Sequence, residues 1–299
     1  MTDMARKRRQ PVIGLFGIGL AAYWPQFPGL HDRLQGYTSE VARRLAAAGA
    51  RVVSAGLVDT QPAAVAAGEQ FRREDVDLIV CHLATYATSS QVLPAVHRAG
   101  VPVLVLNLQP AAALDYENTD TGEWLANCST CCAPEISNAF ARAGVRFHMV
   151  SGTLFDDEAA WTEIEEWCAA AAVSAALRNS RVGFLGHTYP GMLDMYSDFT
   201  MVAAQAGPHI EVLEMCDLQR AVDRVTDDEV GTRLRDARET FVLENCDDED
   251  LQWAARVSAG LDRLVADFDL QGLTYYYRGL DGNAYERLGA GLILGNSLL

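Results

Sequence analysis

Short apolar runs alternate with amphipathic segments along most of this 299-residue chain, and no other feature constrains the fold as strongly. The apolar runs have the length of buried strands, and the segments between them have the spacing of helices that bury one side. Strands that alternate with helices in this way form β-α-β units around a mainly parallel sheet. Ligands of such sheets bind beyond the carboxyl ends of the strands, so candidate functional residues are expected there.

The pattern divides into two parts at a polar segment, residues 178–181. Before it, strands are predicted at residues 11–20, 51–56, 76–82, 101–107 and 146–150, and helices at 30–48, 63–74, 90–99, 135–143 and 159–177. After it, strands are predicted at 182–186, 210–215 and 272–277, and helices at about 197–206, 227–244 and 248–267. We therefore predict two α/β domains, residues 1–179 and 180–299.

The composition argues against several classes of function. A formal charge of −16 and a pI near 4.7 argue against nucleic acid, which needs clustered Lys and Arg. The chain has no signal-peptide pattern and no stretch near the roughly 20 apolar residues of a membrane span, so we expect a cytoplasmic protein without a membrane partner. The seven scattered cysteines predict reduced thiols rather than a disulfide framework.

Two strand ends of the first domain carry residues suited to a polyhydroxylated ligand. Tyr23, Trp24 and Gln26 follow the first strand, and aromatic faces stack on CH groups while an amide pairs with hydroxyls. Aromatics that merely fix the loop to the core explain the same residues equally well. His82 ends the third strand, where it either holds a hydroxyl or moves a proton, or is a hydrogen-bonded residue before a helix cap.

The segment from Asn127 to Glu135 contains Cys128, Cys131 and Cys132. The C-x-x-C spacing occurs in zinc sites, but a structural zinc site needs a second ligand pair that this chain lacks. It also occurs in redox sites, which need a thiol of lowered pKa. We favour a third interpretation, a loop of small polar side chains that lines a pocket and presents Cys128 and Cys131 to the ligand.

The densest group of candidate residues follows the first strand of the second domain. His187, Tyr189 and Met192 surround a Pro-Gly turn there, and loops at strand ends carry ligand contacts. Asp194 or Asp198 is expected to cap the next helix. A further candidate, Arg278 at the end of the last strand, is suited to an anionic group.

Three segments, residues 13–26, 127–135 and 188–198, resemble the L-arabinose/L-fucose isomerase family. The resemblance implies two flavodoxin/Rossmann-like domains with mainly parallel sheets flanked by helices, followed by a metal-binding domain. It implies aldose–ketose isomerisation, in which Mn²⁺ bridges two sugar oxygens and two glutamates move a proton. It also implies a homo-oligomer, a trimer or hexamer, in which the N-terminal domain of one subunit closes the site of another.

This chain departs from that family where the chemistry resides. The family's first metal-binding glutamate falls at Arg278, whose fixed positive charge cannot ligate a cation. The second glutamate and the two metal histidines are expected beyond Leu299, so the family's metal-binding domain is absent. The two N-terminal pocket residues fall at Cys128 and Cys131. We therefore expect no complete catalytic set and no metal ligands, and interpret the apolar end at residues 292–299 as a truncation.

The expected function is that of the sugar-binding part of an isomerase-family protein, inactive on its own. The expected ligand contacts are Tyr23, Trp24, Gln26, His82, Cys128, Cys131, His187, Tyr189, Met192 and Arg278. A non-catalytic sugar-binding or regulatory module is the first alternative. A nucleotide-binding oxidoreductase is disfavoured, because the turn at residues 14–19 has the order G-x-x-G-x-G rather than G-x-G-x-x-G, and no nucleotide is expected.

Overall fold

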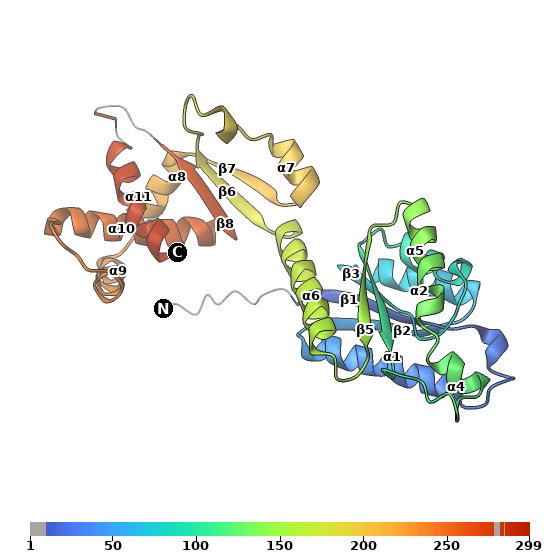
Figure 1. Cartoon of the computed structure of the whole chain (residues 1–299). Coiled ribbons are helices and arrows are strands. Elements are labelled where there is room, and N and C mark those ends of the chain that lie inside the picture. The colour runs from blue at the N-terminus through green and yellow to red at the C-terminus, as the bar shows by residue number, and fades with distance from the viewer. Residues whose placement is uncertain (1–9, 278–281, 284) are drawn as a thin grey trace. The chain divides into compact units, whose positions relative to one another are not determined.

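The computed structural model describes residues 10–277, 282, 283 and 285–299, so Arg278 lies outside the described residues. The chain divides into two compact units (Figure 1). The first unit ends at Ala175, and the second runs from Ala176 to Leu299.

The described part of the first unit contains a five-stranded parallel sheet in the order β2-β1-β3-β4-β5. The strands are β1 (Val12–Ile18), β2 (Arg51–Val58), β3 (Leu78–His82), β4 (Val103–Gln109) and β5 (Phe147–Thr153). Every residue of β1 and β3 is buried, as expected for central parallel strands that are covered on both faces. These strands explain why the apolar runs are nearly continuous in the sequence.

Helices cover both faces of this sheet (Figure 1). One face packs against α1 (Leu30–Ala47) and α6 (Glu158–Arg178), and the other against α2 (Gln61–Arg73), α3 (Leu93–His97) and α5 (Ala133–Arg142). Shorter helices lie in the connections: η1 (Ala21–Tyr23), η2 (Ser89–Gln91), α4 (Thr121–Ala126) and η3 (Thr130–Cys132).

The second unit has a smaller parallel sheet of three strands among its described residues, in the order β7-β6-β8. The strands are β6 (Arg181–Gly186), β7 (His209–Leu213) and β8 (Gly272–Tyr276), and the helices are η4 (Leu193–Met195), α7 (Phe199–Ala206), α8 (Met215–Asp223), α9 (Asp227–Thr240), α10 (Asp248–Asp267) and α11 (Glu286–Leu298). Leu185 and Leu213 join α8, α10 and α11 in one apolar core. The predicted fold class, α/β with mainly parallel sheets flanked by helices, is confirmed.

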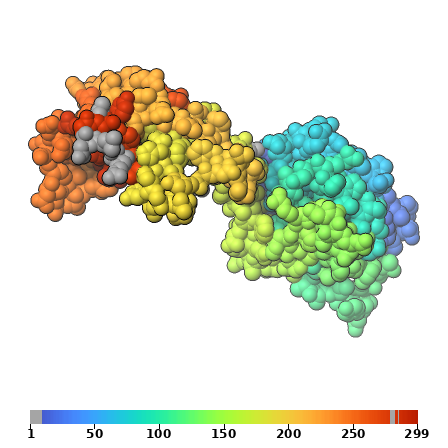
Figure 2. All heavy atoms as spheres, turned by 90° about the horizontal axis from the view of Figure 1, so that it is seen from above, coloured from blue at the N-terminus to red at the C-terminus, as the bar shows by residue number. Residues whose placement is uncertain are grey.

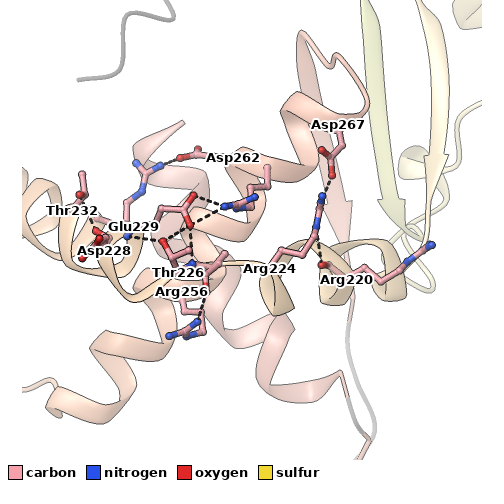
Figure 3. Close-up of polar contacts among 12 residues, drawn as sticks. Arg220, Arg224, Thr226, Asp228, Glu229, Thr232, Arg256, Asp262 and Asp267 are labelled. Carbon is pink, nitrogen blue, oxygen red and sulfur yellow. Dashed lines mark hydrogen bonds and ion pairs between the residues drawn. The ribbon is translucent and has the colours of Figure 1, made fainter.

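A small apolar cluster and ion pairs together hold α9 against α10: Val230 and the partly buried Leu234 of α9 pack with Ala255 and Ala259 of α10. Arg263 donates to both carboxylate oxygens of Glu229, at 2.7 and 2.9 Å, and Glu229 also accepts from the backbone N–H of Thr226 (Figure 3). These donors, with Arg263 as the largest contributor, lower the pKa of Glu229 to about 2.

The second unit contains two helices, α8 and α11, that the sequence analysis did not predict. The strand expected to reach residue 215 ends at Leu213, and α8 begins two residues later. The second of these helices, α11, follows β8 in the chain, and its Leu288 and Leu292 are buried against the core.

Among the described residues we find no helix with both the length and the apolar character that crossing a bilayer requires.

Candidate functional site

The two faces of the second sheet are covered unequally. One face is closed by the apolar core with α8, α10 and α11. On the other face lies α7, none of whose residues is buried. Phe184 of β6 packs on Phe199 of α7 with ring centroids 5.0 Å apart, and beside this contact the face opens into a cavity of about 440 Å³.

Strands, a loop and a helix all contribute to the wall of this cavity. The described lining residues are Val182, Phe184, His187, Thr188, Tyr189, Met192, Asp194, Met195, Ser197, Phe199, Val202, Ile210, Thr274, Tyr275 and Tyr276. The strand side chains make a largely apolar floor, and the loop between β6 and α7 supplies most of the polar groups. An apolar cavity with a few convergent polar groups is the usual form of a small-molecule site.

A glycine turns the chain from β6 into this loop. Gly186 has φ +81°, a left-handed conformation that other residues rarely adopt, and a Cβ there would lie 2.4 Å from the carbonyl oxygen of Tyr276. The next residue, His187, donates its backbone N–H to the same oxygen at 3.0 Å. The loop that follows is exposed, and Figure 2 shows its yellow atoms on the surface. Gly186 thus directs this loop beside the open face of the sheet.

Three aromatic rings meet at the end of β6 and β8. The ring centroids of His187 and Tyr276 lie 5.1 Å apart, and those of Tyr189 and Tyr276 lie 4.9 Å apart. Tyr189 stays 49% exposed, so this cluster leaves aromatic surface free for a ligand. Rings presented in this way suit the CH face of a sugar or cyclic polyol.

The hydrogen bonding of His187 leaves one ring nitrogen available. Its Nδ1 lies 2.8 Å from the carbonyl oxygen of Thr188, which can only accept, so Nδ1 carries the proton. In the neutral ring Nε2 is then an acceptor, and the side chain is exposed. A ligand hydroxyl is a suitable donor to it.

The two aspartates of the loop have different surroundings. Asp198 caps α7, because its Oδ1 accepts the backbone N–H of Met201 at 3.1 Å. Asp194 lines the cavity, and no hydrogen bond or ion pair joins its carboxylate to the part of the chain that the structure describes. Of the two residues that the sequence left open as helix caps, Asp198 takes that role and Asp194 faces the cavity.

The predicted residues of the first unit take part in its own packing. Trp24 donates its Nε1–H to Asp59 at 2.7 Å, and Gln26 donates to the carbonyl of Ala22 at 2.6 Å. Tyr23 packs in a small apolar cluster, and burial raises the pKa of its hydroxyl. These contacts are those of aromatics that fix a loop to the core, and a role in ligand binding stays a prediction.

His82 is fully enclosed at the end of β3. Its Nδ1 lies 3.3 Å from the hydroxyl oxygen of Thr38, which itself donates to the carbonyl of Leu34. Thr38 therefore accepts from Nδ1–H, and burial lowers the pKa of His82 to about 4. The structure thus gives His82 the contacts of a hydrogen-bonded strand-end residue, and its proposed ligand contact is untested.

The prediction of reduced thiols is wrong for one pair of cysteines. Cys128 and Cys131 form a disulfide within the C-x-x-C sequence, whereas Cys81, Cys132, Cys168, Cys216 and Cys246 are free. The sequence rule failed because it counts cysteines along the whole chain, while the turn between α4 and η3 brings these two sulfurs together locally. Among the described residues no group of three or more His, Cys, Asp or Glu side chains is arranged to hold a metal ion.

The structure therefore brings together only part of the predicted site. His187, Tyr189 and Met192 line one cavity in the second unit, while the other described candidates belong to the first unit. The sequence analysis missed Thr274 and Tyr276 as lining residues. Their separation by two positions in a strand, which places both on one face, was the available signal.

A second hollow, of about 680 Å³, lies in the first unit beside α6. Its described lining is mostly charged, with Asp156, Asp157, Glu158 and Glu165. The guanidinium of Arg44 covers the ring of Trp161, 4.5 Å from its centroid. This hollow therefore offers a ligand less free aromatic surface than the cavity of the second unit.

No protein-family model and no curated protein matches the chain. Solved structures that match include an ABC transporter periplasmic solute-binding protein from Actinobacillus succinogenes 130z with bound D-allose. It is 14% identical, with a TM-score of 0.27, over 93% of this chain and 80% of that one. A carbohydrate transporter from Acidothermus cellulolyticus 11B in complex with myo-inositol is 12% identical, with a TM-score of 0.22, over 97% of this chain and 86% of that one.

These comparisons correct the resemblance drawn from the sequence. No family model matches the chain, the two structures above are described as a periplasmic solute-binding protein and a carbohydrate transporter, and the assignment to the L-arabinose/L-fucose isomerase family is wrong. Three short segments carried that assignment, and a glycine turn or a strand-end loop recurs in many α/β folds. The expectation of Mn²⁺ rested on the same resemblance. The oligomer and the cytoplasmic location stay predictions.

Proposed function

We propose that this protein binds a small sugar or cyclic polyol in the cavity of the second unit and acts as a non-catalytic binding module. The observation that carries the proposal is the exposed ring of Tyr189, tilted against Tyr276 beside polar groups that have room for a ligand. A sugar presents apolar CH groups on one face and hydroxyls at its rim, and the cavity offers a partner for each.

The polar groups of the cavity support a ligand rich in hydroxyls. Nε2 of His187 accepts one hydrogen bond, and the two oxygens of the Asp194 carboxylate accept several hydrogen bonds. The hydroxyls of Ser197 and Thr274 both donate and accept. Because a hydroxyl-rich ligand can satisfy groups of both kinds, these side chains favour a polyol over a purely apolar ligand.

The size of the cavity also supports a small ligand. Its volume of about 440 Å³ lies in the lower part of the usual range for ligand pockets, roughly 300–1,000 Å³. Val182, Phe184 and Ile210 form an apolar floor on which a ring can rest. A monosaccharide or inositol fits these dimensions better than a long oligosaccharide.

Isothermal titration calorimetry with pentoses, hexoses, inositols and their open-chain alditols tests the proposal. We expect at least one cyclic polyol to bind, and Tyr189→Ala to weaken its binding about tenfold because a stacking face is lost. Tyr116→Ala is the matched control, since Tyr116 is an 85% exposed tyrosine of the first unit. Binding that Tyr189→Ala and Tyr116→Ala leave equally intact would contradict the proposal.

A further inference from the structure

The proposed sugar site leaves the disulfide of the first unit without a role. Cys128 follows α4, and Cys131 lies in η3, immediately before α5. The two residues differ in accessibility, since Cys128 is buried, with 6% of its surface exposed, and Cys131 is exposed. An attacking thiolate can therefore reach Cys131 more easily than Cys128.

The loop that carries the disulfide is held by contacts that do not depend on it. The hydroxyls of Ser129 and Thr130 donate to Oδ1 of Asn107, at 3.3 and 3.0 Å. Nε2 of Gln109 donates to the hydroxyl oxygen of Thr130 at 2.5 Å, so side chains at the end of β4 hold the turn between the two cysteines in place. Reduction would thus leave both thiols near each other, which favours re-formation of the same bond.

A third cysteine, Cys132, lies beside the pair but is not in a position to attack their disulfide. Cys132 is buried, and its thiol points to the carbonyl oxygens of Ser129, at 3.2 Å, and Thr85, at 3.6 Å. Burial raises the pKa of this thiol to about 11, and only a thiolate attacks a disulfide. The bond therefore stays between Cys128 and Cys131 instead of moving to Cys132.

We propose that Cys128 and Cys131 form a dithiol–disulfide site that exchanges two electrons with an external dithiol. A thiolate of the external dithiol attacks Sγ of Cys131, the bond between the two cysteines breaks, and Cys128 leaves as a thiolate that takes up a proton. The second thiol of the external molecule then attacks the mixed disulfide and releases Cys131. The protein gains two electrons and two protons, and the external dithiol becomes a disulfide.

Thiol alkylation followed by intact-mass and peptide analysis tests this site in the full chain. Cys216→Ser and Cys246→Ser remove the two exposed free thiols and lower the background. We expect no alkylation of Cys128 or Cys131 before treatment, alkylation of both after dithiothreitol, and reversal by oxidised dithiothreitol, with an unchanged circular dichroism spectrum. Alkylation without reductant would overturn the proposal, and so would a bond that dithiothreitol reduces only in denaturant.

Single substitutions test which sulfur is attacked. Cys128→Ser leaves the exposed Cys131 thiol, and Cys131→Ser leaves the buried Cys128 thiol. We expect the remaining thiol of Cys128→Ser to react about tenfold faster with a neutral aromatic disulfide such as dipyridyl disulfide, because accessibility controls the rate. Equal rates or the opposite order would overturn the assignment of Cys131 as the attacked sulfur.

Discussion

The position of the cavity wall in the second unit depends on single residues. His187 and Tyr189 reach Tyr276 because Gly186 turns the chain at the end of β6, and the backbone of His187 then pairs with that of Tyr276. A bend of this kind depends on one residue that tolerates a positive φ. The aromatic cluster is therefore a consequence of one glycine and one strand pairing.

Gly186→Ala tests that dependence. A Cβ at Gly186 would meet a backbone oxygen at 2.4 Å, and the left-handed conformation adds about 1 kcal/mol. We expect the substitution to lower the free energy of unfolding by about 3 kcal/mol in urea denaturation followed by circular dichroism. Gly191→Ala is the control, because Gly191 has φ +89° but open space around its Cβ position, and its cost should stay near about 1 kcal/mol. Equal losses in the two variants would contradict the account of Gly186.

His82 gives the first unit a dependence on pH. Its pKa is about 4 in the folded chain and about 6.5 when unfolded, so protonation favours the unfolded state. The stability that depends on neutral His82 is complete above about pH 6.5 and is lost as the pH falls towards 4. Between pH 7 and pH 5 we expect the wild-type chain to lose about 2 kcal/mol more of its free energy of unfolding than His82→Gln. Identical losses in urea titrations at the two pH values would show that His82 is not buried as a neutral ring.

The helices of the second unit are held by two kinds of contact, apolar packing and ion pairs. Its sheet and α8, α10 and α11 share an apolar core, whereas α9 joins α10 through a smaller apolar cluster and through charged contacts. Glu229 is 39% exposed in its side chain, so water screens its pair with Arg263 and limits the gain to a modest one.

Glu229→Gln tests the contribution of that pair. The lowered pKa of Glu229 means that the pair stabilises the fold above the unfolded pKa of about 4.5, and that the gain is lost as the pH falls through about 2. At neutral pH we expect the variant to lose about 1 kcal/mol of unfolding free energy. Glu239→Gln, in the last turn of the same helix, should change it by less than about 0.5 kcal/mol. Chemical denaturation that ranks the two variants in the opposite order would contradict this account.

The periodicity of the sequence predicts most elements but misses those formed for other reasons. It predicts the strands of both sheets, because buried parallel strands leave continuous apolar runs. It misses α11, which contains three glycines, residues with low helix propensity. The structure explains two of them: a Cβ at Gly291 would lie 2.7 Å from Val257, and one at Gly295 would lie 3.0 Å from Leu261. These two glycines allow α11 to pack closely on α10, and no local sequence pattern encodes that tertiary contact.

The candidate site was predictable only where its residues are neighbours in the chain. The rule that strand ends carry ligand contacts selects His187, Tyr189 and Met192, which belong to one loop. It does not reveal that β8 pairs with β6, and that pairing brings Tyr276 to the same cavity. The same rule selects Trp24 in the first unit, whose polar atom is already bonded to Asp59. A strand-end position therefore identifies a place for chemistry but not whether the side chain is free to take part.

At the scale of the whole molecule, each unit has its own sheet and core, and the two proposed activities belong to different units. The cavity proposed to bind a sugar lies in the second unit, and the disulfide lies in the first. Each can therefore be tested while the other serves as an internal reference in the same chain.

Hydrogen–deuterium exchange of the intact chain, with and without a saturating cyclic polyol, tests the central claim most directly. We expect slower exchange in peptides that cover residues 187–198 and 272–277, because a ligand in the cavity orders the exposed loop against the sheet. Peptides that cover Trp24 and His82 should be unchanged. Protection confined to the first unit, with none in residues 187–198, would contradict the assignment of the sugar site to the second unit.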